Sequence, residues 1–172
     1  KEVQKAGAIF DISKLDWLNS QHLANLSLED FKIQLEPFLD KLNININDHH
    51  DVDLLIQSMR TSDNTYSGIA ESLIPYYREI ESYDEKAITK FIKDKSILNS
   101  LKDIFVNNID NWDENSIDIV LKEFQTQNEL SVPAVNQPIR IALTGSTKSP
   151  SLGLTLVIFG KEKSIERINN LL

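Results

Sequence analysis

The sequence predicts an all-α protein of packed helices. Apolar residues recur at three- and four-residue spacing along most of the chain, which is the period of an amphipathic helix. Residues that favour helix N-termini, such as Ser27, Asp84 and Asp113, stand before these periodic segments. Only 5 of the 172 residues are glycine, and the connections between periodic segments are short. Together these features favour helices that pack on one another through short loops.

The first helix with a clear start is expected to begin at Ser27, with Asp30 as the second member of a capping pair. Pro37 interrupts this segment and predicts a kink or a boundary there. The apolar positions at helical spacing are Leu28, Phe31, Leu35, Phe38, Leu39 and Leu42.

The next two helices follow a polar turn over residues 43–48. The second starts at Asp48 or Asp51, and the third contains Pro75. The apolar face of the second is Val52, Leu55, Ile56 and Met59, and that of the third is Ile69, Leu73, Tyr76, Tyr77 and Ile80.

Three further helices are expected to start at Asp84, Ser96 and Asp113. Their apolar positions are Ile88, Phe91 and Ile92 in the first, Leu98, Leu101, Phe105 and Ile109 in the second, and Ile117, Val120, Leu121 and Phe124 in the third.

The end of the chain is punctuated by prolines and glycines. We expect a loop over 126–136 and then a helix with Pro138 at its first position and Gly145 just past its end.

Pro150 and Gly160 repeat this arrangement, and a last helix runs from about Glu162 to the C-terminus. The apolar, β-branched run 154–159 also fits a strand. The bracketing proline and glycine favour a helix there.

Composition excludes several kinds of function. The chain has no cysteine, which excludes disulfides, thiolate zinc sites and cysteine nucleophiles. No apolar run is long enough for a membrane span, so a membrane is not an expected partner. The cytoplasm is the expected compartment, and because no initiator methionine is present we expect a piece of a longer chain. The formal net charge of -8 by itself argues against nucleic-acid binding.

Candidate catalytic and metal sites are weak. The run His49-His50-Asp51 places neighbouring side chains on different faces of a helix, so no metal site is expected. The segment Gly145–Ser149 lacks the glycine spacing of an ATP-binding loop, although a polar loop before a helix N-terminus can offer N–H groups to a phosphate or a base. No acid–base pair or nucleophile set is evident. Arg140 lies on an apolar helix, where it either has a function or extends out of the core to solvent.

Two segments of the chain are similar to motifs of one known family. Gly7–Asn19 reads GAIFDISKLDWLN and resembles the motif A-V-F-D-x-x-K-L-x-W-x-N of the bacterial glutamyl-tRNA synthetase family. Gln137–Gly145 reads QPIRIALTG and is similar to the family's P-L-R-x-A-L-T-G. The pieces Ser149-Pro150-x-Leu152 and Gly160-Lys161-Glu162 follow, as S-P-x-L and L-G-K-E do in the family. The resemblance spans nearly the whole chain, in the family's order.

The resemblance implies a domain organisation and a parent activity. It implies the end of a stem-contact region over 1–26 and two helical anticodon-binding subdomains, a helical cage over 27–74 and a helical bundle over 75–172. The parent enzyme is a class I ligase that attaches glutamate to tRNA with ATP and Mg²⁺. Its H-I-G-H and K-M-S-K-S motifs are absent from this sequence, so we expect this piece to be inactive and to bind no cofactor.

The resemblance also implies binding residues. By position in the motifs, Arg140, Ser149, Leu152 and Gln137 correspond to residues at the anticodon, and Lys14 to a lysine near the tRNA stem. Implied partners are tRNA(Glu), tRNA(Gln) as a second substrate, and the catalytic domain of the same chain; the piece is expected to be a monomer.

Two positions depart from the family pattern. An arginine that checks the third anticodon base in some members corresponds to Ser62 here, and Arg60 stands two residues earlier as a substitute. Gly153 stands where members often carry an aromatic residue able to stack on a base. The first departure predicts relaxed discrimination between tRNA(Glu) and tRNA(Gln).

The acidic balance leaves a second interpretation open, in which the chain is a stand-alone helical protein-interaction module without RNA binding. RNA binding requires a locally basic face. The residues expected to supply it are Arg140, Lys148, Lys161, Lys163 and Arg167.

Overall fold

The computed structural model describes residues 11–107 and 109–172. Within these ranges the chain forms helices and loops with no strand, which confirms the all-α prediction. Residues 7–10 of the first family-like motif, and the start of the region 1–26, lie outside the described residues.

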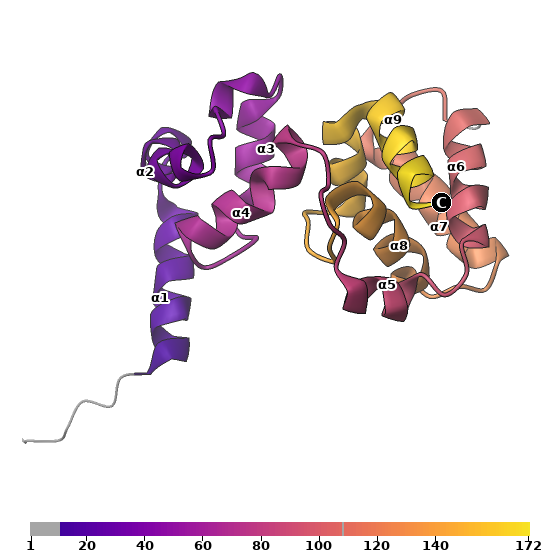
Figure 1. The fold of residues 1–172 in the computed structure, drawn as a ribbon, viewed down its shortest axis with the longest axis horizontal. Helices are drawn as coiled ribbons and strands as arrows, with labels where there is room; N and C mark the ends of the chain where they lie inside the picture. The colour runs from indigo at the N-terminus through magenta and orange to yellow at the C-terminus, as the bar shows by residue number, and fades with distance from the viewer. Residues whose placement is uncertain (1–10, 108) are drawn as a thin grey trace, which may run out of the picture.

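The helices follow one another through short connections (Figure 1). They are α1 Ile12–Asn25, α2 Leu28–Lys41, the 3-10 turn η1 Ile46–Asp48, α3 Val52–Met59, α4 Tyr66–Tyr77, α5 Glu85–Phe91, α6 Ser96–Asn107, α7 Glu114–Gln127, α8 Val132–Thr144 and α9 Leu152–Leu171. Among the described residues, no helix combines the length and apolar character needed to cross a membrane.

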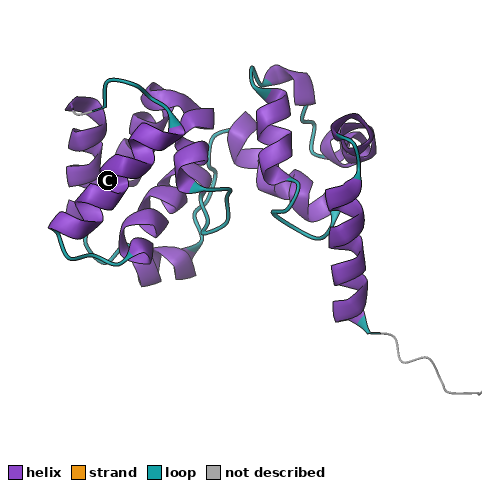
Figure 2. Ribbon diagram, turned by 180° about the vertical axis from the view of Figure 1, so that it is seen from behind, coloured by secondary structure: helices purple, strands orange, loops and turns teal. Residues whose placement is uncertain are grey.

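The helices form two groups, seen from behind in Figure 2. We call α1–α4 with η1 the N-terminal unit and α5–α9 the C-terminal unit. The core of the N-terminal unit includes Phe31, Leu35, Leu55 and Leu73, all fully buried. Each of these apolar positions was expected from the helical spacing.

The core of the C-terminal unit is built from α6, α7, α8 and α9. Phe105 is fully buried, and its ring meets that of Trp112 edge to face, with centroids 5.6 Å apart. The indole Nε1 of Trp112 donates to the carbonyl oxygen of Leu156 at 2.9 Å. This bond ties the loop before α7 to α9.

The predicted N-caps are largely confirmed. The Ser27 hydroxyl accepts from the backbone N of Asp30 at 3.1 Å, and the Asp113 carboxylate accepts from the backbone N of Ser116 at 2.8 Å. The Asp84 carboxylate caps α5 in the same way. Of the two candidates for the second helix, Asp51 is the residue before α3 and Asp48 ends η1.

Two expectations near α8 are wrong. The helix begins at Val132 with Pro133 in its first turn, so Pro138 lies inside the helix and is buried against the core. The loop expected over 126–136 is only residues 128–131. Glu129 adopts a left-handed conformation with φ 53°, and the backbone N of Leu130 donates to the carbonyl of Gln125 at 2.9 Å. This turn satisfies the end of α7 without a glycine, so no glycine marks the end of this helix in the sequence.

The two glycines that were predicted to end helical segments, Gly145 and Gly160, do so. Gly145 ends α8 in the left-handed conformation, with φ 75°. Gly160 has φ 74° and ψ 163° and interrupts α9 at the point where one helix was expected to end. The run 154–159 is helical, so the strand alternative is wrong.

The two units meet at α4, α8 and α9. Ile158 of α9 is 1% exposed and packs in the core of the N-terminal unit, not in that of its own unit. Helix α4 runs through residue 77, across the subdomain boundary placed at 74/75, so that boundary stays a prediction.

Candidate nucleic-acid interface

Arg140 and Ser149 are brought together by the loop between α8 and α9. The Nε of Arg140 donates to the Ser149 hydroxyl at 2.7 Å, and its Nη2 donates to the carbonyl oxygen of Pro150 at 3.0 Å. Two residues that are nine positions apart along the chain therefore form one polar site. Within the described ranges, Nη1 of Arg140 makes no hydrogen bond to another residue.

A buried threonine hydroxyl lies next to the Ser149 hydroxyl of this pair. Thr155 is fully buried, and its hydroxyl donates to the carbonyl oxygen of Ser151 at 2.8 Å and lies 3.1 Å from the Ser149 hydroxyl. The sequence did not identify Thr155, because its role depends on α9 folding back over the loop. Burial lowers the pKa of the Arg140 guanidinium, but arginine remains charged at neutral pH.

The two other predicted anticodon positions, Gln137 and Leu152, lie in different surroundings. Gln137 lies one turn before Arg140 on α8, and its Oε1 is buried with no hydrogen-bond partner. An unpaired buried acceptor is costly, and because this atom is buried a ligand reaches it only if the side chain moves. Leu152, by contrast, is 4% exposed and belongs to the C-terminal core.

The glycine at 153 faces away from this site. A Cβ built there would lie 2.5 Å from Oδ1 of Asp118 and 3.0 Å from Cγ of Glu114, both on α7. Both contacted atoms belong to exposed side chains of α7, which would have to move to admit a side chain at this position.

The two candidate specificity residues lie in the N-terminal unit and differ in how they are used. Arg60 is 8% exposed, and its Nη2 donates to the carbonyl oxygens of Leu23 at 2.8 Å and Leu26 at 2.6 Å. Its guanidinium also lies 5.1 Å from the ring centroid of Phe31. Arg60 thus caps the C-terminal end of α1 and is not directed at solvent. Ser62 is half-buried, and its hydroxyl oxygen has no hydrogen-bond partner.

A cleft of about 330 Å³ lies between the two units, beside Ser62. One wall comes from α4 and Asp63, the residue after Ser62, and the other from Thr144 and the loop up to Lys148. The cleft therefore joins the neighbourhood of the specificity position to the loop that leads into Ser149. Lys14, on α1, is exposed and apart from this cleft.

The expected basic face is wrong for three of its five members. Lys161 donates to the carbonyl oxygens of Val106 and Ile109, both at 3.1 Å, and so caps the end of α6. Lys163 pairs with Glu79 and Glu166, and Arg167 is only 3% exposed.

Among the described residues, Arg140 and Lys148 are the members of that set whose side chains neither bind the C-terminal end of a helix nor form an ion pair. Each of the other arginines, Arg60, Arg78 and Arg167, binds carbonyl groups at the end of a helix. Arg140 instead binds a serine and a carbonyl in a loop, which makes it the arginine best placed for a ligand.

The histidine pair is a packing feature. The rings of His49 and His50 stack with centroids 4.8 Å apart, and burial lowers the pKa of His49. In the part of the chain that the structure describes, no group of three or more metal-ligating side chains is found.

Comparison with known proteins shows the family to which the chain is similar. A family model described as "Anticodon binding domain" matches residues 30–172. The chain is 33% identical over 171 residues to a glutamate--tRNA ligase of Myxococcus xanthus, covering 98% of this chain and 36% of that protein. It is 30% identical over 177 residues to glutamate--tRNA ligase 2 of Thermosipho melanesiensis, covering 100% of this chain and 38% of the relative.

A solved structure agrees in fold. The crystal structure of a glutamate tRNA ligase from Elizabethkingia meningosepticum, in complex with its amino acid, matches with a TM-score of 0.76 at 26% identity. That match covers 98% of this chain and 33% of the other. The chain thus spans about a third of the length of the relatives it matches. These findings favour an anticodon-binding region over the stand-alone interaction module.

Proposed function

The chain belongs to the anticodon-binding domain family, and from this premise we propose that it recognises the anticodon of tRNA(Glu) as part of a glutamate--tRNA ligase. ATP-dependent attachment of glutamate, with Mg²⁺, would belong to the region of the relatives that this chain does not match. The relatives' names, and not a catalytic group on this chain, support that assignment. The cytoplasm is the compartment in which such a ligase would act.

One observation carries the proposal: Arg140 is held by Ser149 and Pro150 with part of its guanidinium uncommitted. Single-stranded RNA is read through bases turned outward, whose edges accept and donate hydrogen bonds. An arginine fixed by two bonds loses little further conformational freedom when it binds a base edge. Nη1 of Arg140 is the group we expect to contact the anticodon, with Gln137 one turn earlier on α8 as a neighbouring residue whose side chain would have to move to take part.

This mode of recognition also accommodates the acidic composition. Base stacking and edge hydrogen bonds need fewer cations than a footprint built on phosphates. Since Lys161, Lys163 and Arg167 are engaged internally, we expect the chain alone to bind weakly and to lose affinity as salt rises.

The test is a titration of the 172-residue chain with an anticodon stem-loop of tRNA(Glu) at low and moderate salt. We expect Arg140→Ala to weaken binding by about 1–3 kcal/mol and to reduce discrimination against stem-loops with altered anticodons. Lys122→Ala, an exposed lysine on α7, is the matched control and should bind as the unaltered chain does. Equal binding by the chain and Arg140→Ala would remove Arg140 as a reader.

The third anticodon base is a separate question. Arg60 caps α1, and Ser62 carries no charge, so neither supplies a guanidinium at the discriminating position. We therefore propose that binding of tRNA(Gln) is tolerated. Stem-loops that differ only at the third base should bind this chain with similar affinity, and a strong preference for the tRNA(Glu) base would contradict this.

A further inference from the structure

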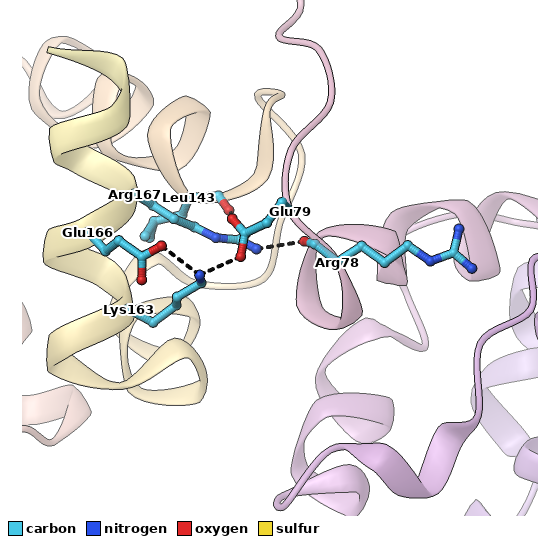
Figure 3. Close-up of polar contacts among 6 residues, drawn as sticks. All are labelled: Arg78, Glu79, Leu143, Lys163, Glu166 and Arg167. Atoms are coloured by element: carbon cyan, nitrogen blue, oxygen red, sulfur yellow. Dashed lines mark hydrogen bonds and ion pairs between the residues drawn. The ribbon is translucent and has the colours of Figure 1, made fainter.

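The contact between the two units centres on one buried arginine. Arg167 of α9 donates through Nη1 to the carbonyl oxygen of Leu143 in α8, and through Nη2 to that of Arg78, just past α4, at 2.7 Å (Figure 3). It is 3% exposed, so it cannot itself reach RNA. One guanidinium thus joins the end of α8, the end of α4 and α9.

An aromatic stack extends this contact. The Arg167 guanidinium lies 4.5 Å from the ring centroid of Phe159, whose ring stacks on Tyr76 of α4 at 4.7 Å with 12° between the planes. Burial raises the pKa of Tyr76 to about 12, against the opposing charges of Arg140 and Arg167. Tyr76, from the N-terminal unit, therefore lies close to both arginines of the C-terminal unit.

The remaining polar contacts across this junction are weaker. Lys163 of α9 pairs with Glu79, just past α4, at 2.5 Å, and with Glu166 of its own helix at 2.8 Å. Figure 3 shows Lys163 between these two acidic side chains. Both acidic side chains are more than half exposed, and such surface pairs contribute little to stability. The more buried contacts between the units include those of Arg167, the Tyr76–Phe159 stack and Ile158.

We propose that Arg167 is a positioning residue that fixes the N-terminal unit relative to the Arg140–Ser149 site. Leu143, which it holds, lies three residues after Arg140 on α8. The cleft beside Ser62 has one wall from each unit, so its shape depends on the angle between the units. The RNA part of this inference rests on the proposed function, but the geometric part does not.

The geometric part is tested by the distance between spin labels on the two units. The chain has no cysteine, so Ile33→Cys on α2 and Ile119→Cys on α7, both exposed, accept labels at unique positions. We expect a narrow distance distribution that broadens in Arg167→Met. Lys161→Met, which removes a helix cap inside one unit, should leave the distribution narrow. An unchanged distribution in Arg167→Met overturns the proposal.

A second pair of variants keeps the test decisive if Arg167→Met does not fold. Tyr76→Leu removes the stack on Phe159 and should broaden the distribution. Tyr76→Phe keeps the ring that stacks on Phe159 and removes only the hydroxyl, which lies beside Thr155, and should leave it narrow. If Tyr76→Leu gives the narrow distribution of the unaltered chain, the stack does not set the angle and the proposal fails.

The RNA measurement connects the angle to recognition. If the correct orientation falls to about a tenth of the population, the apparent affinity for the stem-loop falls about tenfold. We expect this loss in Arg167→Met and not in Lys161→Met. If the unaltered chain binds no stem-loop, the proposed function fails, while the label distances still decide the role of Arg167. Full RNA affinity together with a broadened distribution would overturn the link between angle and recognition.

Discussion

The N-terminal and C-terminal units use the same device, a buried arginine on helix carbonyls, for different purposes. Arg60 binds the end of α1 and packs on Phe31, and all its contacts stay inside the N-terminal unit. Arg167 binds α8 in its own unit and the end of α4 in the other. The chemistry is alike, but the first fixes a helix inside one unit and the second fixes one unit against the other. The carbonyls that a buried arginine binds, and not its burial, therefore determine its role.

The largest effect is expected from the C-terminal core. Phe105→Ala removes a fully buried ring that meets Trp112, and should cost about 3–5 kcal/mol of unfolding free energy. Chemical denaturation followed by Trp112 fluorescence measures this, with Trp17→Phe to remove the signal of the tryptophan on α1. A loss below about 1 kcal/mol would mean that the site relaxes around the cavity, and that the two cores differ in rigidity.

The next effect concerns Arg60. Arg60→Met leaves the carbonyls of Leu23 and Leu26 without their donor and should cost about 1–3 kcal/mol. Hydrogen exchange should report faster exchange at the end of α1, with no change in the distance between labels on the two units. If that distance distribution broadens as in Arg167→Met, the contrast between the two arginines fails.

Gly145 tests the connection between the units. Gly145→Ala forces a side chain into the left-handed region, with its Cβ 3.1 Å from Cγ2 of Ile80 and from the carbonyl oxygen of Ser82. The strain should cost about 1–2 kcal/mol. Thermal unfolding measures the loss. Gly160→Ala has open space around its Cβ, but its φ of 74° and ψ of 163° lie in a region that is essentially restricted to glycine, so its loss reports backbone strain without a side-chain contact.

The smallest effect is a pH dependence at the exposed pair between the units. The hydrogen bond from Lys163 lowers the pKa of Glu79 below its ordinary value. The pair therefore stabilises the folded state above the ordinary glutamate pKa, and this contribution is lost as pH falls through the lowered pKa. Because Glu79 is largely exposed, the effect should stay below about 1 kcal/mol. Unfolding curves of the chain and Glu79→Gln from neutral to acid pH should converge, and a gap that persists at low pH would contradict this.

Two residues of the candidate site were predictable from sequence, but the residues that lie against them were not. The motif resemblance identified Arg140 and Ser149, and the structure brings them within hydrogen-bonding distance. Thr155 and Tyr76 were not identified as neighbours of the site, because they reach it from helices whose packing is long-range. The basic face failed for a related reason: Lys161 and Arg167 read as free cations in sequence but bind distant carbonyls.

The sequence by itself determined most of the helices, with their caps and apolar faces, since these depend on residues three or four positions apart. It did not predict α1 or the start of α8. It also determined that Gly145 and Gly160 interrupt helices, because backbone conformation is a local property. Only the tertiary structure decided which cations remain available to a ligand and how the two units are joined. Those features depend on contacts such as that of Arg167 with Arg78, 89 residues apart along the chain. Such contacts are made between helix ends, where unpaired carbonyl groups occur irrespective of the side chains nearby.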